Sequence, residues 1–348
     1  MKVTVRSRFF SARSEMDKRI QIALLLLVIS FRLVAVNAYG AMPTPMRVSY
    51  PAPTATQLPL WVAKEAKFFE KHGIAVDLVY VGSSSIAIAA LFSGQLAVVA
   101  GGGVGGIASY LQGYRDLALF GSLNNRLNFF IYAHHSIVDA SGLRGKRFGV
   151  SRFGGVGDFA ARYFLKRAHL DPRKDVSFLQ VGSQSEMTPA LTRGAIEAGV
   201  VSVPQNFTVK KLGFKELADL TQSGARYASN AFLAKRQFLI DNQARMESFL
   251  KALIESIHFI KTKRFEALSI LSRYTRTTDP EALNITYNEY VQKVWPQIPD
   301  IQPEDLTAVL EQQAETNPKA LEINPADLIH DALMENVVRS GFVKQVYR

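Results

Sequence analysis

Two glycine–serine turns, 100 residues apart, contain the residues best suited to binding chemistry. The segment 81–94 reads VGSSSIAIAALFSG and the segment 181–194 reads VGSQSEMTPALTRG, with seven of 14 positions identical. Each turn precedes a helix-like stretch, and backbone N–H groups at a helix amino terminus bind anions without a basic side chain. We therefore predict that the polar residues of both turns face a ligand: Ser83, Ser84, Ser183 and Gln184. Capping of their own helices by these side chains is the alternative.

Loops that follow predicted strands contribute further candidates, because open parallel sheets bind ligands at the carboxyl ends of their strands. Arg152 is the strongest of them, since a guanidinium pairs with a carboxylate, sulfonate or phosphate; a solvated loop arginine is the alternative. The remaining candidates are Thr54, Thr56, Gln57, Asn124, Phe153, Gly154, Pro204 and Gln205. For Asn124 and its neighbour Asn125, the shaping of a turn is the alternative to lining a cleft.

The glycine-rich run at 101–106 contains the pattern G-x-G-x-x-G directly after a predicted strand. A dinucleotide-binding fold would place this pattern after its first strand, with an acidic residue about 20 positions further on. Here the run follows the third strand, and Asp116 is poorly spaced for that role. We expect Gly102 and Gly103 instead to let the backbone approach a small ligand or to pack tightly at the edge of a cleft.

Catalytic and metal-binding patterns are missing from the sequence. The six histidines are scattered, no H-E-x-x-H spacing occurs, and no serine lies in a G-x-S-x-G turn. The chain has no cysteine, which excludes disulfides, thiolate metal sites, a cysteine nucleophile and a lipid-modified cysteine. We predict no catalytic residue, no metal and no cofactor.

Strands and helices alternate through the first two thirds of the chain. Strands are expected at 46–50, 74–81, 96–100, 117–121, 128–133, 148–151, 176–181 and 200–203, with amphipathic helices between them. The order strand, helix, strand, Gly-Ser turn, helix from 47 to 94 recurs from 147 to 194. This order predicts two similar α/β lobes with parallel sheets and a cleft between them.

The expected organisation is a leader at 1–38, a first lobe at 44–135, a second lobe at 136–226, and a return to the first lobe at 227–348. The first crossing is expected at 139–146 and the second at 227–233. Beyond residue 242 the pattern is helical throughout, so this region should wrap the first lobe.

The charge and hydropathy of the amino terminus indicate export. Residues 1–40 carry a net charge of +5 out of the total of +11, and no basic stripe interleaved with aromatic residues follows, so a nucleic-acid partner is not expected. Lys18-Arg19, an apolar run at 20–29 and the small residues at 36–38 form the pattern of a secretory leader; an uncleaved anchor is the alternative. Met16 would give a neater start. We expect a periplasmic monomer that is not a lipoprotein.

Several segments resemble one known family. MRVSY at 46–50, LPLW at 58–61, FFEKHGI at 68–74, GKRFGV at 145–150 and Val203-Pro204 are similar to the nitrate/sulfonate/taurine-type solute-binding proteins of ABC transporters. The same superfamily includes binders of thiamine-pyrimidine precursors. The resemblance covers about residues 46–260 and implies a type II-like periplasmic binding protein with a central cleft that closes on its ligand. The family usually has an acidic residue three positions after Ala-Leu-x-x-Gly; the first lobe has Ala97 there, and the second keeps Glu197.

The function that these features predict is capture of a small anionic organic solute, such as a sulfonate or nitrate, and its delivery to an ABC permease in the inner membrane. The first alternative is an extracytoplasmic sensing protein that signals to a membrane partner. The second is a pyrimidine-precursor synthase-like enzyme on the same fold, although the chain cannot form the cysteine-rich iron site of such an enzyme.

Overall fold

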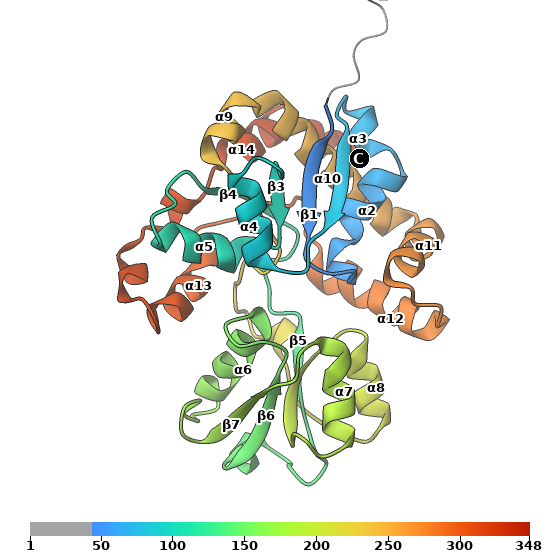
Figure 1. The fold of residues 1–348 in the computed structure, drawn as a ribbon. Coiled ribbons are helices and arrows are strands. Elements are labelled where there is room, and N and C mark those ends of the chain that lie inside the picture. Colours follow the sequence, from blue (N-terminus) through green and yellow to red (C-terminus); the bar gives the residue numbers. More distant parts are fainter. Residues whose placement is uncertain (1–43) are drawn as a thin grey trace, which may run out of the picture. The chain divides into compact units, whose positions relative to one another are not determined.

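The computed structural model describes residues 44–348, apart from the side chain of Ser84. Two five-stranded sheets, each covered by helices, form two lobes (Figure 1). The leader predicted at 1–38 lies outside the described residues. Within residues 44–348 no helix combines the length and apolar character needed to cross a membrane.

The sheet of the first lobe has the order β2-β1-β3-β10-β4. Its strands are β1 (Met46–Tyr50), β2 (Val76–Tyr80), β3 (Val98–Ala100), β4 (Ala118–Ser122) and β10 (Ala231–Ala234). Strand β1 runs parallel to β2 and β3, whereas β10 is antiparallel to both β3 and β4. The strand between β3 and β4 therefore comes from a distant part of the chain.

The sheet of the second lobe has the order β7-β6-β8-β5-β9 and comes entirely from residues 129–219. Its strands are β5 (Phe129–Ala133), β6 (Lys146–Val150), β7 (Val176–Gln180), β8 (Ala198–Ser202) and β9 (Lys215–Asp219). Met46 pairs with Val76 in the first lobe, and Lys146 pairs with Val176 in the second. The 100-residue repeat is thus a repeat of sheet registers, and the predicted pair of α/β lobes is confirmed.

Helices fill the connections. The first lobe has α2 (Leu58–Glu65), α3 (Phe68–Lys71), α4 (Ser84–Phe92) and α5 (Gly103–Leu111), and the second has α6 (Val156–Arg167), α7 (Gln184–Thr192) and α8 (Gln205–Lys211). Short 3₁₀ turns are η1 (Ala55–Gln57), η2 (Ala140–Leu143) and η3 (Leu220–Gln222). Gly73, which follows α3, has a φ of 72°, the left-handed conformation that glycine favours at the end of a helix.

The chain passes between the lobes through two crossing segments, residues 123–128 and 223–230. The predicted first crossing at 139–146, and with it the boundary at 135/136, is wrong, because β5 pairs antiparallel with β8 and β9 in the second sheet. Its side chains Ile131 to Ala133 are buried there, and burial against those two strands outweighs sequence proximity to β4. Residues 139–146 contain η2 and stay inside the second lobe.

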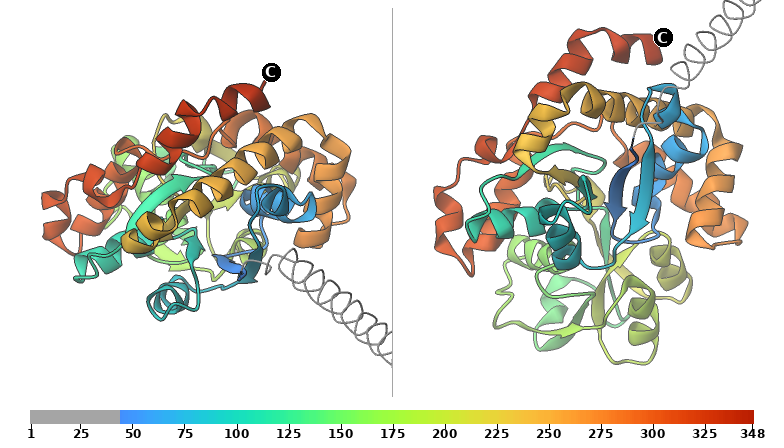
Figure 2. Two further views of the ribbon diagram at one scale, coloured as in Figure 1. Left: turned by 90° about the horizontal axis from the view of Figure 1, so that it is seen from above. Right: turned by 45° about the horizontal axis from the view of Figure 1, so that its top comes forward.

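The carboxyl-terminal helices gather around the first lobe, as predicted (Figure 2). They are α9 (Arg236–Asp241), α10 (Gln243–Thr262), α11 (Arg264–Thr275), α12 (Pro280–Glu289), the π-helix η4 (Tyr290–Val294), α13 (Glu304–Ala314), α14 (Ala332–Arg339) and α15 (Phe342–Val346), with 3₁₀ turns η5 (Pro318–Glu322) and η6 (Pro325–Leu328). The apolar face of α10 is fully buried, and Phe249 packs against Phe69, Phe120 and Phe232. Trp61 belongs to the same core and stacks on Tyr274.

Candidate functional site

A cavity of about 350 Å³ lies between the two lobes, in the size range of small-molecule sites. The first lobe contributes the loop after β1, with Thr54, Thr56 and Gln57. The second lobe contributes Phe129, Val156 and Gln184, together with the turn 202–205. Helices α11 and α12 form a third wall. Residues far apart in the chain therefore meet where the strands of both sheets end.

Gln57 lies at the inner side of the cavity and is held by the second crossing segment. Its Nε2 donates a hydrogen bond to Asn230 Oδ1 at 3.2 Å, and Asn230 Nδ2 donates to the carbonyl oxygen of Thr56 at 3.2 Å. Gln57 is only 2% exposed, and its Oε1 has no hydrogen-bond partner among residues 44–348. Gln57 is thus a buried residue at the cavity, held in place by its contact with Asn230.

Tyr290 connects the cavity to the first crossing segment. Its hydroxyl accepts a hydrogen bond from Asn128 Nδ2 at 2.9 Å and also bonds the Thr56 side chain. Burial raises the pKa of Tyr290 to about 12, so the phenol stays neutral at physiological pH. Tyr290 opens a π-helical turn, a local irregularity that often occurs at functional sites.

Replacing Tyr290 with phenylalanine should lower the free energy of unfolding by about 1–2 kcal/mol, because the buried amide of Asn128 loses its acceptor. Urea denaturation measures the change. The control is Tyr80→Phe: residue 80 is 59% exposed, so this change should alter stability by less than about 0.5 kcal/mol. Equal losses in the two variants would contradict a role for the Tyr290 hydroxyl.

The second lobe positions its polar lining through backbone contacts. Gln184 Oε1 accepts from the backbone N–H of Ser202 at 3.0 Å, and its Nε2 donates to the carbonyl of Val200 at 3.3 Å. The side chain therefore extends β8 at the strand end instead of pointing freely into solvent. The turn that follows contains the cis peptide bond Val203-Pro204, and then Gln205 begins α8.

Six of the predicted residues meet in this cavity: Thr54, Thr56, Gln57, Gln184, Pro204 and Gln205. The serines of the Gly-Ser turns do not line it. The hydroxyl of Ser83 bonds that of Ser85 at 2.9 Å, and the hydroxyl of Ser183 bonds that of Ser185 at 2.7 Å. Neither serine makes a side-chain capping bond, so the capping interpretation is wrong for both. The side chain of Ser84 is not described.

Arg152, Phe153 and Gly154 also lie outside the lining, on an exposed loop after β6. The loop is held by its own contacts, since the N–H of Phe153 donates to Gln180 Oε1 at 3.0 Å and that of Gly154 to Asp158 Oδ2 at 2.9 Å. The arginine predicted as the charged ligand partner is therefore a surface residue of the second lobe in this structure.

Gly102 and Gly103 are buried packing positions. A Cβ atom on Gly102 would lie 2.7 Å from Leu233 Cβ, and one on Gly103 would lie 2.5 Å from the carbonyl oxygen of Ala228. A methyl group cannot lie so close to another carbon or oxygen atom. Glycine at these two positions therefore allows α5 to approach β10 and the second crossing segment. Of the two predicted explanations, tight packing is the one that the structure favours.

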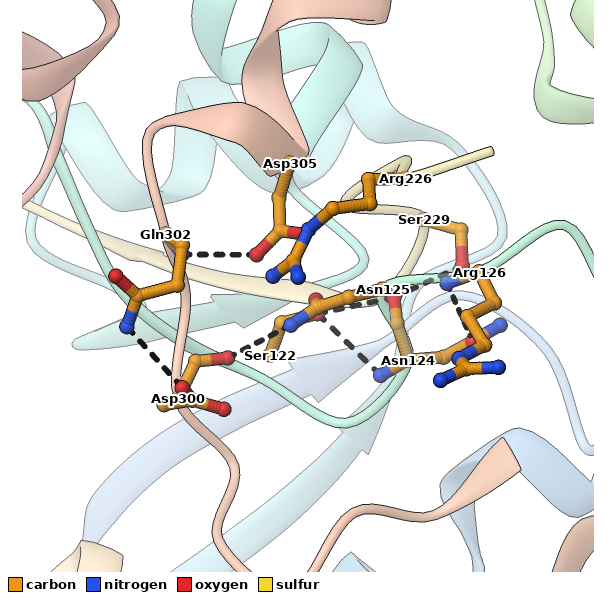
Figure 3. A network of polar contacts seen from close by, with 9 residues as sticks. All are labelled: Ser122, Asn124, Asn125, Arg126, Arg226, Ser229, Asp300, Gln302 and Asp305. Carbon is orange, nitrogen blue, oxygen red and sulfur yellow. Dashed lines mark hydrogen bonds and ion pairs between the residues drawn. The ribbon is translucent and has the colours of Figure 1, made fainter. Parts of the chain in front are cut away.

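Asn124 is fully buried in the first crossing segment and holds the two segments together. Its carbonyl oxygen accepts from the N–H and the hydroxyl of Ser229, at 3.1 and 3.2 Å, and its Oδ1 accepts from the N–H of Arg126 at 3.0 Å (Figure 3). An antiparallel bridge also pairs Arg126 with Arg226. Asn124 thus shapes the connection between the lobes, and it does not line the cavity.

The start of α13 anchors the crossing segments to the carboxyl-terminal helices. Asp305 is fully buried and accepts from Arg226 Nε at 2.7 Å and from the N–H of Gln302 at 2.8 Å (Figure 3). Its carbonyl accepts from the N–H of Ala228 at 2.9 Å, and Asn125 Nδ2 donates to the carbonyl of Asp300 at 3.0 Å.

The sequence prediction missed the third wall of the cavity and both crossing asparagines, Asn128 and Asn230. The wall contributes Leu271, Thr275, Thr277, Leu283, Thr286 and Tyr290. These residues belong to α11, α12, the loop between them and the π-helix, which have no counterpart in the second lobe, so the internal repeat could not indicate them. Among residues 44–348 no group of three metal-ligating side chains occurs.

Known proteins share this architecture. The putative binding protein YtlA of Bacillus subtilis (strain 168) is 23% identical over 237 residues, which cover 67% of this chain and 71% of that protein. The periplasmic aliphatic sulphonate binding protein SsuA of Escherichia coli matches with a TM-score of 0.69 at 16% identity, over 82% of this chain and 97% of that one. The periplasmic nitrate-binding protein NrtA of Synechocystis PCC 6803 matches with a TM-score of 0.63 at 14% identity, over 85% and 89%.

These similarities confirm the periplasmic binding protein fold predicted from the sequence. The NMT1/THI5 like family matches residues 55–267, which is more than half of the chain. This chain, which has two α/β lobes, two crossing segments and a cavity between the lobes, belongs to the NMT1/THI5 like family.

Proposed function

We propose that this protein is the solute-binding component of an ABC import system, which encloses a small organic molecule between its lobes and presents it to a membrane permease. The observation that carries the proposal is the cavity itself, which both lobes line beside the crossing segments. A molecule that contacts both walls stabilises the closed arrangement over the open one, so binding energy drives closure. The names of the relatives, a putative binding protein and two periplasmic binding proteins, agree with this role.

Binding without catalysis is the form of the proposal that the lining favours. Among residues 44–348, none of those that line the cavity is a histidine, aspartate, glutamate, lysine or arginine. The hydroxyl groups of its serines and threonines therefore have no general base beside them in the lining, and a nucleophile needs one. An export route, a periplasmic location and a monomeric state complete the proposal.

Closure can be tested directly because the chain contains no cysteine. We would introduce Glu70→Cys in the first lobe and Lys174→Cys in the second, both exposed, and attach a spin label at each. A compound that raises the thermal unfolding midpoint should also narrow the distribution of distances between the labels. Reconstitution with a candidate permease and its ATPase then separates transport from sensing, since a transport component makes uptake of the same compound depend on it.

Binding that leaves the distance distribution unchanged would contradict closure. Stabilisation without any uptake through the permease would contradict transport and favour the sensing alternative. The doubly labelled protein without any compound provides the reference for the distance distribution and for the thermal unfolding midpoint.

A further inference from the structure

We propose that ion pairs at two places hold the lobes together even without a solute, and that a rise in ionic strength releases them. Five side chains form these pairs, and we call them the interlobe latch: Lys166, Arg173, Lys211, Glu281 and Glu315. The inference rests on the proposed function only in that the lobes close and open. It requires no particular solute and no permease.

The first contact of the latch joins α13 to the second lobe. Glu315 directly follows α13, and its Oε1 lies 3.2 Å from Nζ of Lys166, in the last turn of α6. Its Oε2 lies 3.7 Å from Nη2 of Arg173, in the loop before β7. One carboxylate of the carboxyl-terminal helices therefore faces two cations of the second lobe.

The second contact joins α12 to the second lobe. Nζ of Lys211, the last residue of α8, donates to Oε2 of Glu281, in the first turn of α12, at 2.6 Å. In Figure 1, α13 and α6 lie on one side of the molecule, and α12 and α8 lie on the other. The latch therefore holds the second lobe at two separate places, and the second lobe supplies the cations at both.

Helices α12 and α13 are each fixed to a crossing segment at the end away from the latch. Asp305, near the start of α13, contacts the second crossing segment, and Glu315 lies ten residues later, about 15 Å along a helix. Tyr290, directly after α12, contacts the first crossing segment, and Glu281 lies nine residues earlier, about 14 Å away. A rotation of the lobes about the crossing segments would therefore separate the latch residues while these anchors stay in place.

One more ion pair connects the same parts of the molecule but is not part of the latch. Lys293 in η4 lies 3.7 Å from Asp219 at the end of β9, so here the second lobe supplies the carboxylate. Because Lys293 follows Tyr290 by three residues, it lies near the anchored end of α12, where such a rotation separates atoms least.

The latch is weak enough to respond to salt. The side chains of Lys211 and Glu281 are 64% and 58% exposed, and a pair of this kind changes an equilibrium by about 1.5- to 5-fold. Three such pairs should favour the closed over the open arrangement by roughly tenfold. The Debye length falls from about 30 Å at 10 mM salt to about 3 Å at 1 M, so this preference should disappear at high salt. The affinity for any solute that contacts both lobes should fall with it.

Spin labels measure the latch without any solute. We would place them at Glu70→Cys and Lys146→Cys, one exposed position in each lobe, and leave Lys174 unchanged because it adjoins Arg173. At 10 mM NaCl we expect a population with short distances between the labels. At 1 M NaCl the ratio of short to long distances should fall roughly tenfold. Circular dichroism at both salt concentrations checks that the fold is unchanged.

Two double variants separate the latch from general effects of charge. Glu281→Gln combined with Glu315→Gln keeps the shape of both side chains, and at 10 mM NaCl it should show the distribution that the parent protein shows at 1 M. The matched control is Glu65→Gln combined with Glu335→Gln, which removes two carboxylates whose partner arginines lie within the first lobe and its helices. The control should keep the full salt response of the parent protein.

Charge reversal tests the second contact alone. Lys211→Glu should lower the population with short distances, because it places two carboxylates together, and the addition of Glu281→Lys should restore that population. A Lys211→Glu protein that the second change does not restore would contradict a direct attraction between these two side chains.

The inference is overturned if the parent protein has the same distribution at both salt concentrations, whether closed or open, or if the two double variants respond alike. If the latch fails in this way but a solute still narrows the distribution, the proposed function stands. If the latch is found but no solute of any class binds, the proposed function fails and the latch is a property of the fold alone.

Discussion

Replacing Asp305 with alanine should lower the free energy of unfolding by about 2–4 kcal/mol. The fully buried carboxylate accepts from Arg226 Nε and from the N–H of Gln302, and the variant leaves both donors without this partner. The side chain of Arg226 is half exposed, so water recovers part of its loss and keeps the effect below that of a fully buried pair. Urea denaturation, followed by circular dichroism, measures the change.

Two further variants separate the charge from the position. Asp305→Asn keeps an acceptor and nearly the same shape, so it should lose about half as much stability as the alanine variant. Glu304→Ala changes the adjacent, exposed carboxylate and should stay within about 0.5 kcal/mol of the parent protein. If Asp305→Ala and Glu304→Ala are equally stable, the contact with the crossing segment contributes nothing.

Replacing Gly103 with alanine should cost about 2–4 kcal/mol of unfolding free energy, because the new methyl group would lie 2.5 Å from the carbonyl oxygen of Ala228. That oxygen belongs to backbone, which cannot swing aside as a flexible side chain can. The change would have to displace the second crossing segment or the start of α5. Thermal and urea denaturation both measure the loss.

Gly157 provides a matched control, since it also lies in the first turn of a helix of the α/β lobes. A Cβ atom there would be 3.5 Å from Ser151 Oγ, an ordinary contact. Gly157→Ala should therefore leave stability unchanged or raise it by up to about 1 kcal/mol, the usual advantage of alanine over glycine in a helix. Equal effects at both positions would contradict the packing role of Gly103.

Local patterns predicted eight of the ten strands in the described residues and missed β9 and β10, the second of which lies partly in the predicted crossing at 227–233. The strands β1 and β6, the helices that follow them and the left-handed Gly73 depend on residues close together in sequence, which periodicity and turn chemistry report. Local sequence patterns do not report which strands pair when they lie far apart in the chain. The placement of β5 depends on contacts with β8 and β9, which lie much later in the chain, so the pattern of apolar residues could identify a strand but not its sheet.

The residues of the candidate site also divide into those that local sequence could predict and those that it could not. Thr54, Thr56 and Gln57 were predictable because loops at the carboxyl ends of parallel strands bind ligands. Arg152 occupies the equivalent loop of the second lobe, but neither its charge nor its position reveals that the loop folds back onto Asp158 and Gln180. Tyr290 was not predictable, since nothing near it in the sequence distinguishes a cavity wall from an ordinary amphipathic helix.

The position of β10 has a consequence for the order of assembly. This strand lies between β3 and β4, so the first sheet has a gap between those two strands until residues 231–234 have been synthesised. The second lobe uses only the continuous segment 129–219 and has no such requirement. During chain elongation the later lobe can therefore complete its fold first, while the earlier one waits with two strand edges unpaired.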